Sequence, residues 1–228
     1  MSSAEGTVAE ETEAEVERDE AREALLAQFT AELGDAVIGS HIRPGDALWV
    51  RVDAAAWRTA AEYAKGGLHC EFFDFLSAID WLPSPFGRDM DSQEDLVVHG
   101  KEPKEAPPMQ SGYAGGDTRF QVLARVASTS RGHDVILKAD VPDDDLSIDT
   151  WMPVYAGANW HEREAWEMFG ISFAGHPHLA HLYLPGDFEG HPMRKDYPLL
   201  ARRVKPWPGI VDVEPMPGGG DDEGGDGE

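Results

Sequence analysis

Two stretches decide the fold: Arg119-Phe-Gln-Val-Leu-Ala-Arg-Val-Ala127 and Asp134-Val-Ile-Leu-Lys-Ala-Asp-Val141. In both of them every second side chain is apolar, which is the period of a strand that buries one face. The connection 128–133 contains Gly132 and is short enough for an antiparallel hairpin. The sequence therefore predicts that these two strands pair as part of a sheet.

The residues before this hairpin show helical and strand periodicity in turn. Asp53 can cap the second helix, and Gly66 and Gly67 can end it. We predict an α+β domain over 20–146, with a mixed or antiparallel sheet and flanking helices. Its elements before the hairpin are a helix at 20–34, a strand at 47–52, a helix at 54–65 and a strand at 72–81.

Three segments depart from this regular pattern. Residues 83–117 are rich in Pro and Gly and are expected to form a long loop, with room for a short strand at 96–99. Residues 147–170 are expected to form a helical connector that begins near Ser147–Asp149. Residues 171–211 combine Pro, Gly, His and charge with little periodicity, which indicates an extended C-terminal arm.

An arm of this composition forms few backbone hydrogen bonds within itself, while ordering each residue costs roughly 1–2 kcal/mol. It cannot bury enough apolar surface against itself to offset that cost. It must therefore cover the sheet domain or wrap another protein, and its length favours a partner protein.

The charge of the chain is concentrated at its two ends. The formal net charge is −24. Residues 1–24 hold nine acidic and two basic side chains, and residues 212–228 hold seven acidic and no basic ones. We expect acidic disordered tails at 1–19 and 212–228, because like charges repel and few apolar groups are present. This charge disfavours nucleic acid and anionic lipid as partners.

Membrane-spanning and cofactor-binding motifs are missing from the sequence. No apolar run is long enough for a membrane helix, so direct membrane insertion is not expected. Cys70 is the single cysteine, whereas an iron–sulfur cluster takes four thiolates. Gly112 to Gly116 lacks the lysine and the strand-to-helix context of a phosphate loop.

The clearest resemblance to a known family lies in Asn159-Trp-His-Glu-Arg-Glu-Ala-Trp-Glu-Met-Phe-Gly-Ile171. It resembles the helix signature of the C subunit of proton-pumping NADH–quinone oxidoreductase (respiratory complex I): Glu-Arg-Glu, two variable residues, Asp, one variable residue, Phe-Gly. The stretches Phe173-Ala-Gly-His-Pro177 and Leu184-Pro-Gly-Asp-Phe-Glu-Gly-His-Pro-Met-Arg-Lys-Asp-Tyr-Pro-Leu199 continue the resemblance.

The resemblance implies a non-redox subunit of the peripheral arm, on the cytoplasmic side of the cell membrane. It implies packing chiefly on the D subunit, which helps form the quinone site, near the B and I subunits. FMN and the iron–sulfur clusters are implied to lie in partner subunits, so this chain is expected to have no cofactor and no catalytic residue. The implied subunit-interface residues are Glu162, Arg163, Glu164, Glu167, His176, Pro177, Asp187, His191, Pro192, Arg194, Lys195 and Asp196.

The chain departs from the family pattern at two positions. Glu167 stands where the family usually has Asp, which keeps the charge and lengthens the side chain by one methylene. His181 stands where Arg is expected before the Leu-x-Leu-Pro stretch, so a bidentate contact is weakened or replaced.

The histidines and glutamates of these stretches admit other interpretations. The cluster His176, His178, His181 and His191 could ligate zinc or iron, but imidazoles between Gly and Pro more often bond backbone carbonyls. Glu162 and Glu164 lie on different helix faces, so they cannot form an acid–base pair.

A second set of alternatives concerns charge and function. Arg194 is expected to fork onto a partner carboxylate or backbone with Asp196 holding it, against the simpler interpretation of a surface charge cluster. One alternative function is the equivalent subunit of a membrane-bound hydrogenase or other donor–quinone oxidoreductase. An alternative of another class is a stand-alone metalloenzyme that uses the histidine cluster.

Overall fold

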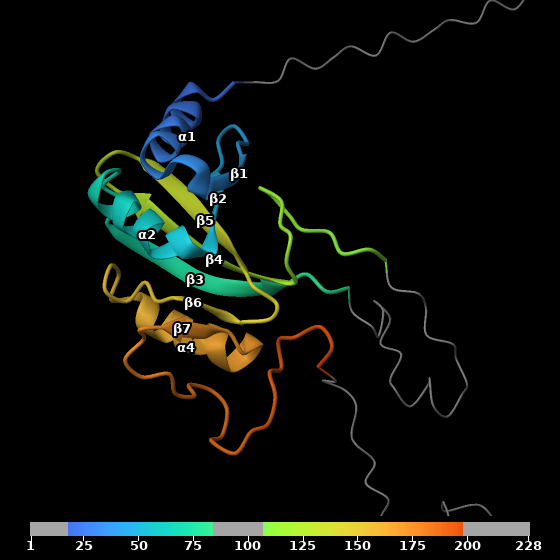
Figure 1. Cartoon of the computed structure of the whole chain (residues 1–228). Coiled ribbons are helices and arrows are strands. Elements are labelled where there is room, and N and C mark those ends of the chain that lie inside the picture. Colours follow the sequence, from blue (N-terminus) through green and yellow to red (C-terminus); the bar gives the residue numbers. More distant parts are fainter. Residues whose placement is uncertain (1–17, 84–106, 198–228) are drawn as a thin grey trace, which may run out of the picture.

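The computed structural model describes residues 18–83 and 107–197 (Figure 1). Within them one sheet of five strands forms the centre, in the order β1-β2-β5-β4-β3. All neighbouring strands run antiparallel except β2 and β5, which are parallel, so the sheet is mixed. The strands are β1 (Val37–His41), β2 (Leu48–Val52), β3 (Phe72–Asp80), β4 (Phe120–Ser128) and β5 (His133–Val141).

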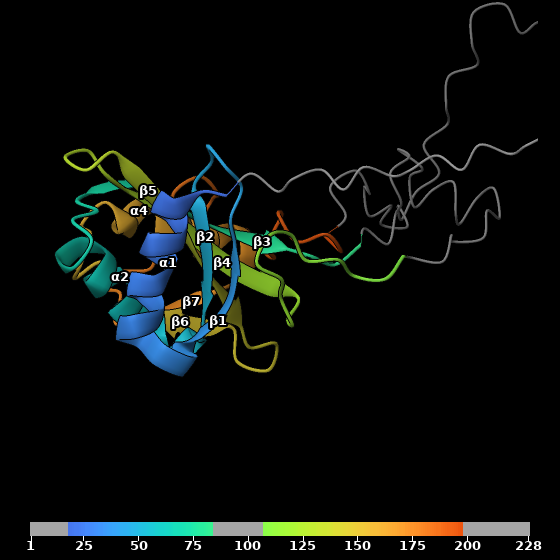
Figure 2. The ribbon, with the colours of Figure 1, turned by 90° about the horizontal axis from the view of Figure 1, so that it is seen from above.

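Two helices near the N-terminus cover one face of this sheet. They are α1 (Glu20–Leu33) and α2 (Trp57–Gly66), and short 3-10 turns at Gly34–Ala36 and Ala54–Ala56 adjoin them. The Asp53 carboxylate accepts a hydrogen bond from the Ala55 amide, which caps the turn that enters α2. Figure 2 shows both helices on one side of the strands and the segment that enters β4 on the other side.

The core lies between these helices and the inner face of the sheet. Every second residue of the strands, such as Val50, Val122 and Val135, is buried there together with Phe29 of α1 and Trp57 of α2. The outer face carries the alternate residues, among them Trp49, Leu123 and Lys138. This alternation is what positions the two surfaces described below.

A second unit follows β5. Strand β6 (Ser147–Asp149) pairs in parallel with β7 (Ser172–Ala174), and α4 (Ala158–Phe169) connects them beside β3. Ile171 and Phe173 of this unit are buried in the same core as the sheet domain. The unit and the sheet therefore share one hydrophobic core.

The structure confirms the predicted α+β class and all four predicted strands, with ends that shift by one residue at most. The helical connector was wrong at its start. Ser147–Asp149 is a strand because it bonds to β7, and the helix begins only at Ala158. The sequence analysis also missed β1.

Several predictions fall on residues outside the described parts. They are the acidic tails at 1–19 (apart from its last two residues) and 212–228, the short strand at 96–99, most of the loop 83–117 and the end of the arm beyond Tyr197.

Candidate docking site formed by helix α4 and the arm

After β7 the chain runs beneath α4 and returns to the sheet (Figure 1). We call residues 175–197 the described arm. It has no regular secondary structure, so its backbone polar groups depend on partners elsewhere. Three sets of contacts supply them, two on α4 and one at the end of β3.

The first contact is the Glu167 carboxylate of α4, which receives the backbone of the arm. Its oxygens accept hydrogen bonds from the amides of Leu182 at 2.9 Å, Tyr183 at 3.2 Å and Leu184 at 2.6 Å. Burial of Glu167 by itself favours the neutral acid, but these three amides and His181 lower the pKa of the carboxyl below its ordinary value. The carboxylate is therefore an ionised anchor for the arm.

The second contact caps the end of α4. The last carbonyl groups of a helix lack partners within it. Here His191 Nδ1 bonds the Glu167 carbonyl at 2.9 Å, the Met193 amide bonds the Met168 carbonyl at 3.1 Å, and Arg194 Nε bonds the Phe169 carbonyl at 2.7 Å. Gly170 ends the helix in the left-handed conformation, with φ 78°.

The third contact fastens the end of the described arm to the sheet. Asp80, whose side chain is fully buried at the end of β3, accepts from the Lys195 amide at 2.8 Å. Arg119 bonds both carboxylates, with Nη2 2.8 Å from Asp80 Oδ2 and 2.8 Å from Asp196 Oδ1. Hydrogen bonding to Asp80 and Asp196 raises the pKa of Arg119, and the same contact lowers the pKa of Asp196.

Glu162 lies on the opposite side of α4 and joins the helix to β6. It is completely buried, and its carboxylate accepts from Thr150 Oγ1 at 2.5 Å and from the Trp151 amide at 2.6 Å. Burial raises the pKa of Glu162 to about 7, against the opposing effect of these two hydrogen bonds. Glu162 and Glu167, two of the three glutamates that were expected at a subunit interface, thus have partners within this chain.

Arg163 and Arg194 also have different partners from those expected. Arg163 donates to the carbonyls of Ala180 and His181 of its own chain. Arg194 reaches the helix carbonyl of its own chain, while Asp196 pairs with Arg119. These basic side chains organise the arm.

The remaining predicted interface residues keep free surface. Glu164, Pro177, Asp187 and Lys195 are exposed, whereas His176, Pro192 and His191 are half-buried. Their expected contacts with a partner stay predictions. Within the chain, His176 Nε2 lies 3.3 Å from the Asn159 carbonyl oxygen.

Three large apolar side chains on this unit were not predicted from the sequence. Trp160 on α4 is 70% exposed, and Tyr183 and Met193 on the arm are 66% and 55% exposed. One signal was present in the sequence: an extended chain turns alternate residues to opposite sides, and Tyr183 lies between two half-buried leucines. Exposed aromatic residues of this size are typical of protein–protein contacts.

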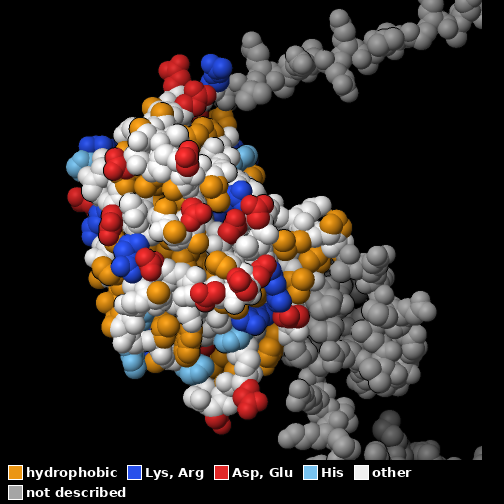
Figure 3. Space-filling view, viewed as in Figure 1, with side chains coloured by type: hydrophobic (Ala, Val, Ile, Leu, Met, Phe, Trp, Pro, Cys, Tyr) orange, Lys and Arg blue, Asp and Glu red, His pale blue; other side chains and the backbone are white. Residues whose placement is uncertain are grey.

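The four histidines do not converge on one point. His176 bonds the Asn159 carbonyl, His181 bonds Glu167, and His191 bonds a helix carbonyl. Figure 3 shows histidine side chains spread over the lower part of the molecule, where α4 and the arm lie. Among residues 18–83 and 107–197, no group of three or more His, Cys, Asp or Glu is placed to hold a metal ion.

Known proteins share this pattern of sequence. The family described as "Respiratory-chain NADH dehydrogenase, 30 Kd subunit" matches residues 50–203, which include the end of β2, all of β3 to β7, α4 and the described arm. The chain belongs to this family. Of the helices in the described parts, none has the length and apolar character needed to cross a bilayer.

Curated relatives are named as the C/D subunit of NADH-quinone oxidoreductase. The protein from Yersinia pestis (strain Pestoides F) is 45% identical over 91 residues, which are 40% of this chain and 15% of the relative. The protein from Citrobacter koseri is 39% identical over 137 residues, which are 60% of this chain and 21% of the relative. The chain therefore spans no more than about a fifth of the length of these relatives.

A solved structure shares the fold. It is a chain of the membrane-bound sulfane sulfur reductase (MBS), an archaeal respiratory membrane complex. The TM-score is 0.52 at 18% identity, and the match covers 78% of this chain and 86% of that one. At this identity the likeness concerns the fold alone.

Proposed function

We propose that this chain is a non-redox subunit of the peripheral arm of an NADH–quinone oxidoreductase, docked on the D subunit. In this proposal it supports assembly of the complex that transfers electrons from NADH to a quinone with coupled proton translocation. Membership of the NADH dehydrogenase 30 Kd subunit family supports the assignment of this chain to an NADH–quinone oxidoreductase. The C/D name of relatives that extend far beyond the match supports the D subunit as the neighbour.

One observation carries the docking role. The arm is fastened to α4 through Glu167 and the helix end, and yet Trp160, Tyr183 and Met193 remain on the surface. An arm held before binding loses less conformational entropy when a partner arrives. The unit is thus a preorganised surface that offers large apolar side chains to a partner.

We also propose where the redox groups of the complex and the other neighbouring subunits lie. FMN and the iron–sulfur clusters belong to partner subunits, with the B and I subunits beside this chain on the cytoplasmic side of the cell membrane. The carboxylates of α4 support a structural role, because Glu162 and Glu167 are engaged with backbone amides of this chain. We assign no catalytic residue to the chain.

The test uses substitutions on the exposed apolar residues. Trp160→Asp combined with Tyr183→Asp is expected to reduce co-purification with the D subunit from solubilised membranes by at least about tenfold, because a charge replaces apolar contact at an interface. Ile38→Asp on β1 is the matched control, since Ile38 is an exposed apolar residue far from α4 in the sheet order. Unchanged co-purification of the double variant would refute this docking surface.

Point substitutions test the docking surface more specifically than deletion of the arm from residue 171 onward. Ile171 and Phe173 are buried in the core, so that deletion would unfold part of the domain as well as remove the arm.

A further inference from the structure

The outer face of the sheet carries a second surface that the docking role does not use. The buried apolar side chains of α1, α2 and α4 join the core on the inner face. On the outer face, the segment 107–117 lies across the strands and leaves a groove beside it. The groove is separate from α4 and the arm.

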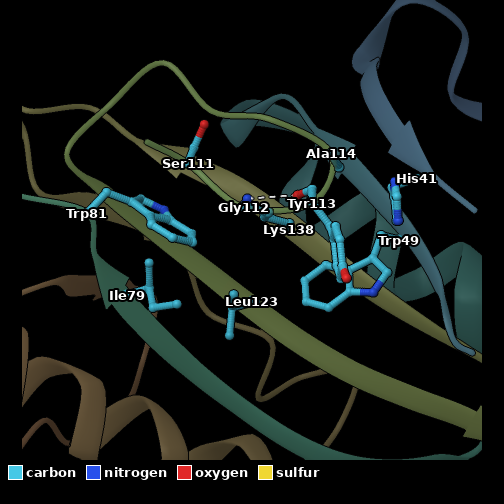
Figure 4. A pocket seen from close by; sticks show the side chains of 10 residues that line it. All are labelled: His41, Trp49, Ile79, Trp81, Ser111, Gly112, Tyr113, Ala114, Leu123 and Lys138. Carbon is cyan, nitrogen blue, oxygen red and sulfur yellow. Dashed lines mark hydrogen bonds between the residues drawn. The ribbon is translucent and has the colours of Figure 1, made fainter. Parts of the chain in front are cut away.

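The groove has a volume of about 620 Å³, within the roughly 300–1,000 Å³ usual for binding pockets. Figure 4 shows Trp81 at one end with Ile79 below it, Trp49 with Tyr113 at the other end, and Leu123 between them. The remaining lining residues are His41, Ser111, Gly112, Ala114 and Lys138. Aromatic and aliphatic side chains thus form most of the groove.

The wall formed by segment 107–117 is held in place from the sheet. Lys138 Nζ donates to the carbonyls of Tyr113 and Gly115, each at 2.9 Å, and Gln121 Nε2 donates to the Gly115 carbonyl at 3.2 Å. Gly112 packs so closely on Trp81 that an added Cβ would lie 2.9 Å from the indole ring. The groove is therefore bounded by fixed walls.

The charge of the groove is opposite to that of the chain. The formal net charge is −24, and yet no Asp or Glu is among the ten lining residues. Lys138 is almost fully buried, and its ammonium lies 5.0 Å from the centre of the Trp81 ring. Burial lowers the pKa of Lys138 to about 8, so it is mostly charged at neutral pH. A second cation in the groove would be repelled at low dielectric constant.

The apolar surface continues past the groove. Tyr113 on its rim is 44% exposed, and the nearby Met109 is 40% exposed. A surface that extends beyond the pocket fits a polypeptide with several side chains better than a compact small molecule.

We infer that this groove receives an apolar segment of another subunit, which inserts an aromatic or aliphatic side chain and carries no lysine or arginine there. The inference rests on the proposed function in one respect, namely that the chain works within a multisubunit complex. It adds a second interface on the outer face of the sheet, with the charge preference set by Lys138.

The test is photo-crosslinking in the assembled complex. Tyr113 is replaced by p-benzoylphenylalanine, which keeps an aromatic ring on the rim, and the crosslinked peptides are identified by mass spectrometry after solubilisation. We expect a crosslink to an apolar, non-basic segment of another subunit. Crosslinks confined to this chain, to lipid or to a basic segment would overturn the inference, as would the absence of any crosslink.

A charge variant tests the groove itself. Ile79→Lys places a second cation in the groove beside Trp81 and is expected to weaken the crosslink by at least about tenfold, whereas Ile79→Met should leave it unchanged. Co-purification with the D subunit is measured on the same samples and shows that the variants fold. Failure of all samples to assemble would count against the proposed function, whereas assembly with an unaltered crosslink in Ile79→Lys would count against the groove.

Discussion

The two positions at which the chain departs from the family pattern touch each other: His181 Nδ1 lies 3.1 Å from Glu167 Oε1. The longer carboxylate at 167 and the shorter basic side chain at 181 therefore fill one space together. Because Glu167 also holds three arm amides, this pair decides how the arm is seated on α4.

Because Glu167 and His181 are in contact, substitutions at these two positions should have coupled effects on stability. Glu167→Asp should destabilise the chain because the shorter carboxylate recedes from the amides of Leu182 and Leu184. His181→Arg alone should crowd the contact, and the double variant should recover part of the loss, with a coupling free energy of about 0.5–3 kcal/mol. Chemical unfolding of the four proteins measures this cycle, and strictly additive effects would contradict a shared contact.

Arg119 should contribute far more to stability than Arg125. Arg119→Met leaves the fully buried Asp80 carboxylate without its cation and is expected to cost about 3–5 kcal/mol. Arg125 also bonds two carboxylates, those of Asp74 and Asp134, but its side chain is 42% exposed. Arg125→Met is therefore expected to cost less than about 1 kcal/mol. Equal losses in denaturant unfolding would show that burial of Asp80 does not matter.

Two glycines with the same backbone conformation provide a test of arm packing. Gly170 has φ +78° and Gly45 has φ +79°, so alanine is strained at both positions by about 1–2 kcal/mol. A Cβ at position 45 meets no atom within 4 Å, whereas at position 170 it meets Arg194 and lies 2.6 Å from His191 Nε2. Gly170→Ala should therefore also release the arm, seen as faster amide exchange at 182–184. Gly45→Ala should leave this exchange unchanged.

The raised pKa of Glu162 predicts that its contribution to the stability of the chain falls as the pH rises. Burial raises the pKa of Glu162 from its ordinary 4.5 to about 7 in the folded chain. Between these values the folded state keeps a proton that the unfolded state has released. The protonated Glu162 carboxyl group therefore makes its full contribution to the stability of the folded chain below about pH 4.5. This contribution is lost as the pH rises through about 7.

The measurement is the difference in unfolding free energy between the wild type and Glu162→Gln across that range. Other carboxylates titrate in both proteins and cancel in the difference. The variant should gain stability relative to the wild type as the pH rises, and a flat difference would show that Glu162 is ionised throughout.

The parts of the fold that sequence could predict are those with strong local periodicity. The alternation in 120–128 and 133–141 requires one buried face, and the helix 57–66 has its apolar stripe between Asp53 and the glycines that follow. Strand β1 has the sequence Val-Ile-Gly-Ser-His, which has little alternation, so only its pairing with β2 makes it a strand.

The predicted start of the helical connector was wrong for a similar reason. Trp151, Val154 and Tyr155 recur at helical spacing, but they occupy turns because Ser147–Asp149 is pulled into a parallel pair with β7. A pairing between segments this far apart leaves no local trace in the sequence.

The motif residues of the site were found, but the groups they bind were not. Glu162, Glu167 and Arg194 were expected to face a partner subunit because the family resemblance implies it. Glu162 is instead buried where it bonds Thr150 and Trp151. The contacts of Glu167 and Arg194 depend on an arm that folds back onto α4. Asp80 and Arg119 were missed altogether, since an ion pair between two strand ends depends on their register.

The parallel pairing of β2 with β5 has a consequence for synthesis. Leu48 pairs with Val135, so the first two strands leave the ribosome long before the strand that must lie beside β2. In that interval the free edge of β2 has no partner strand and is open to wrong pairing. Until β5 has been translated, this edge is a site at which the nascent chain is prone to aggregate.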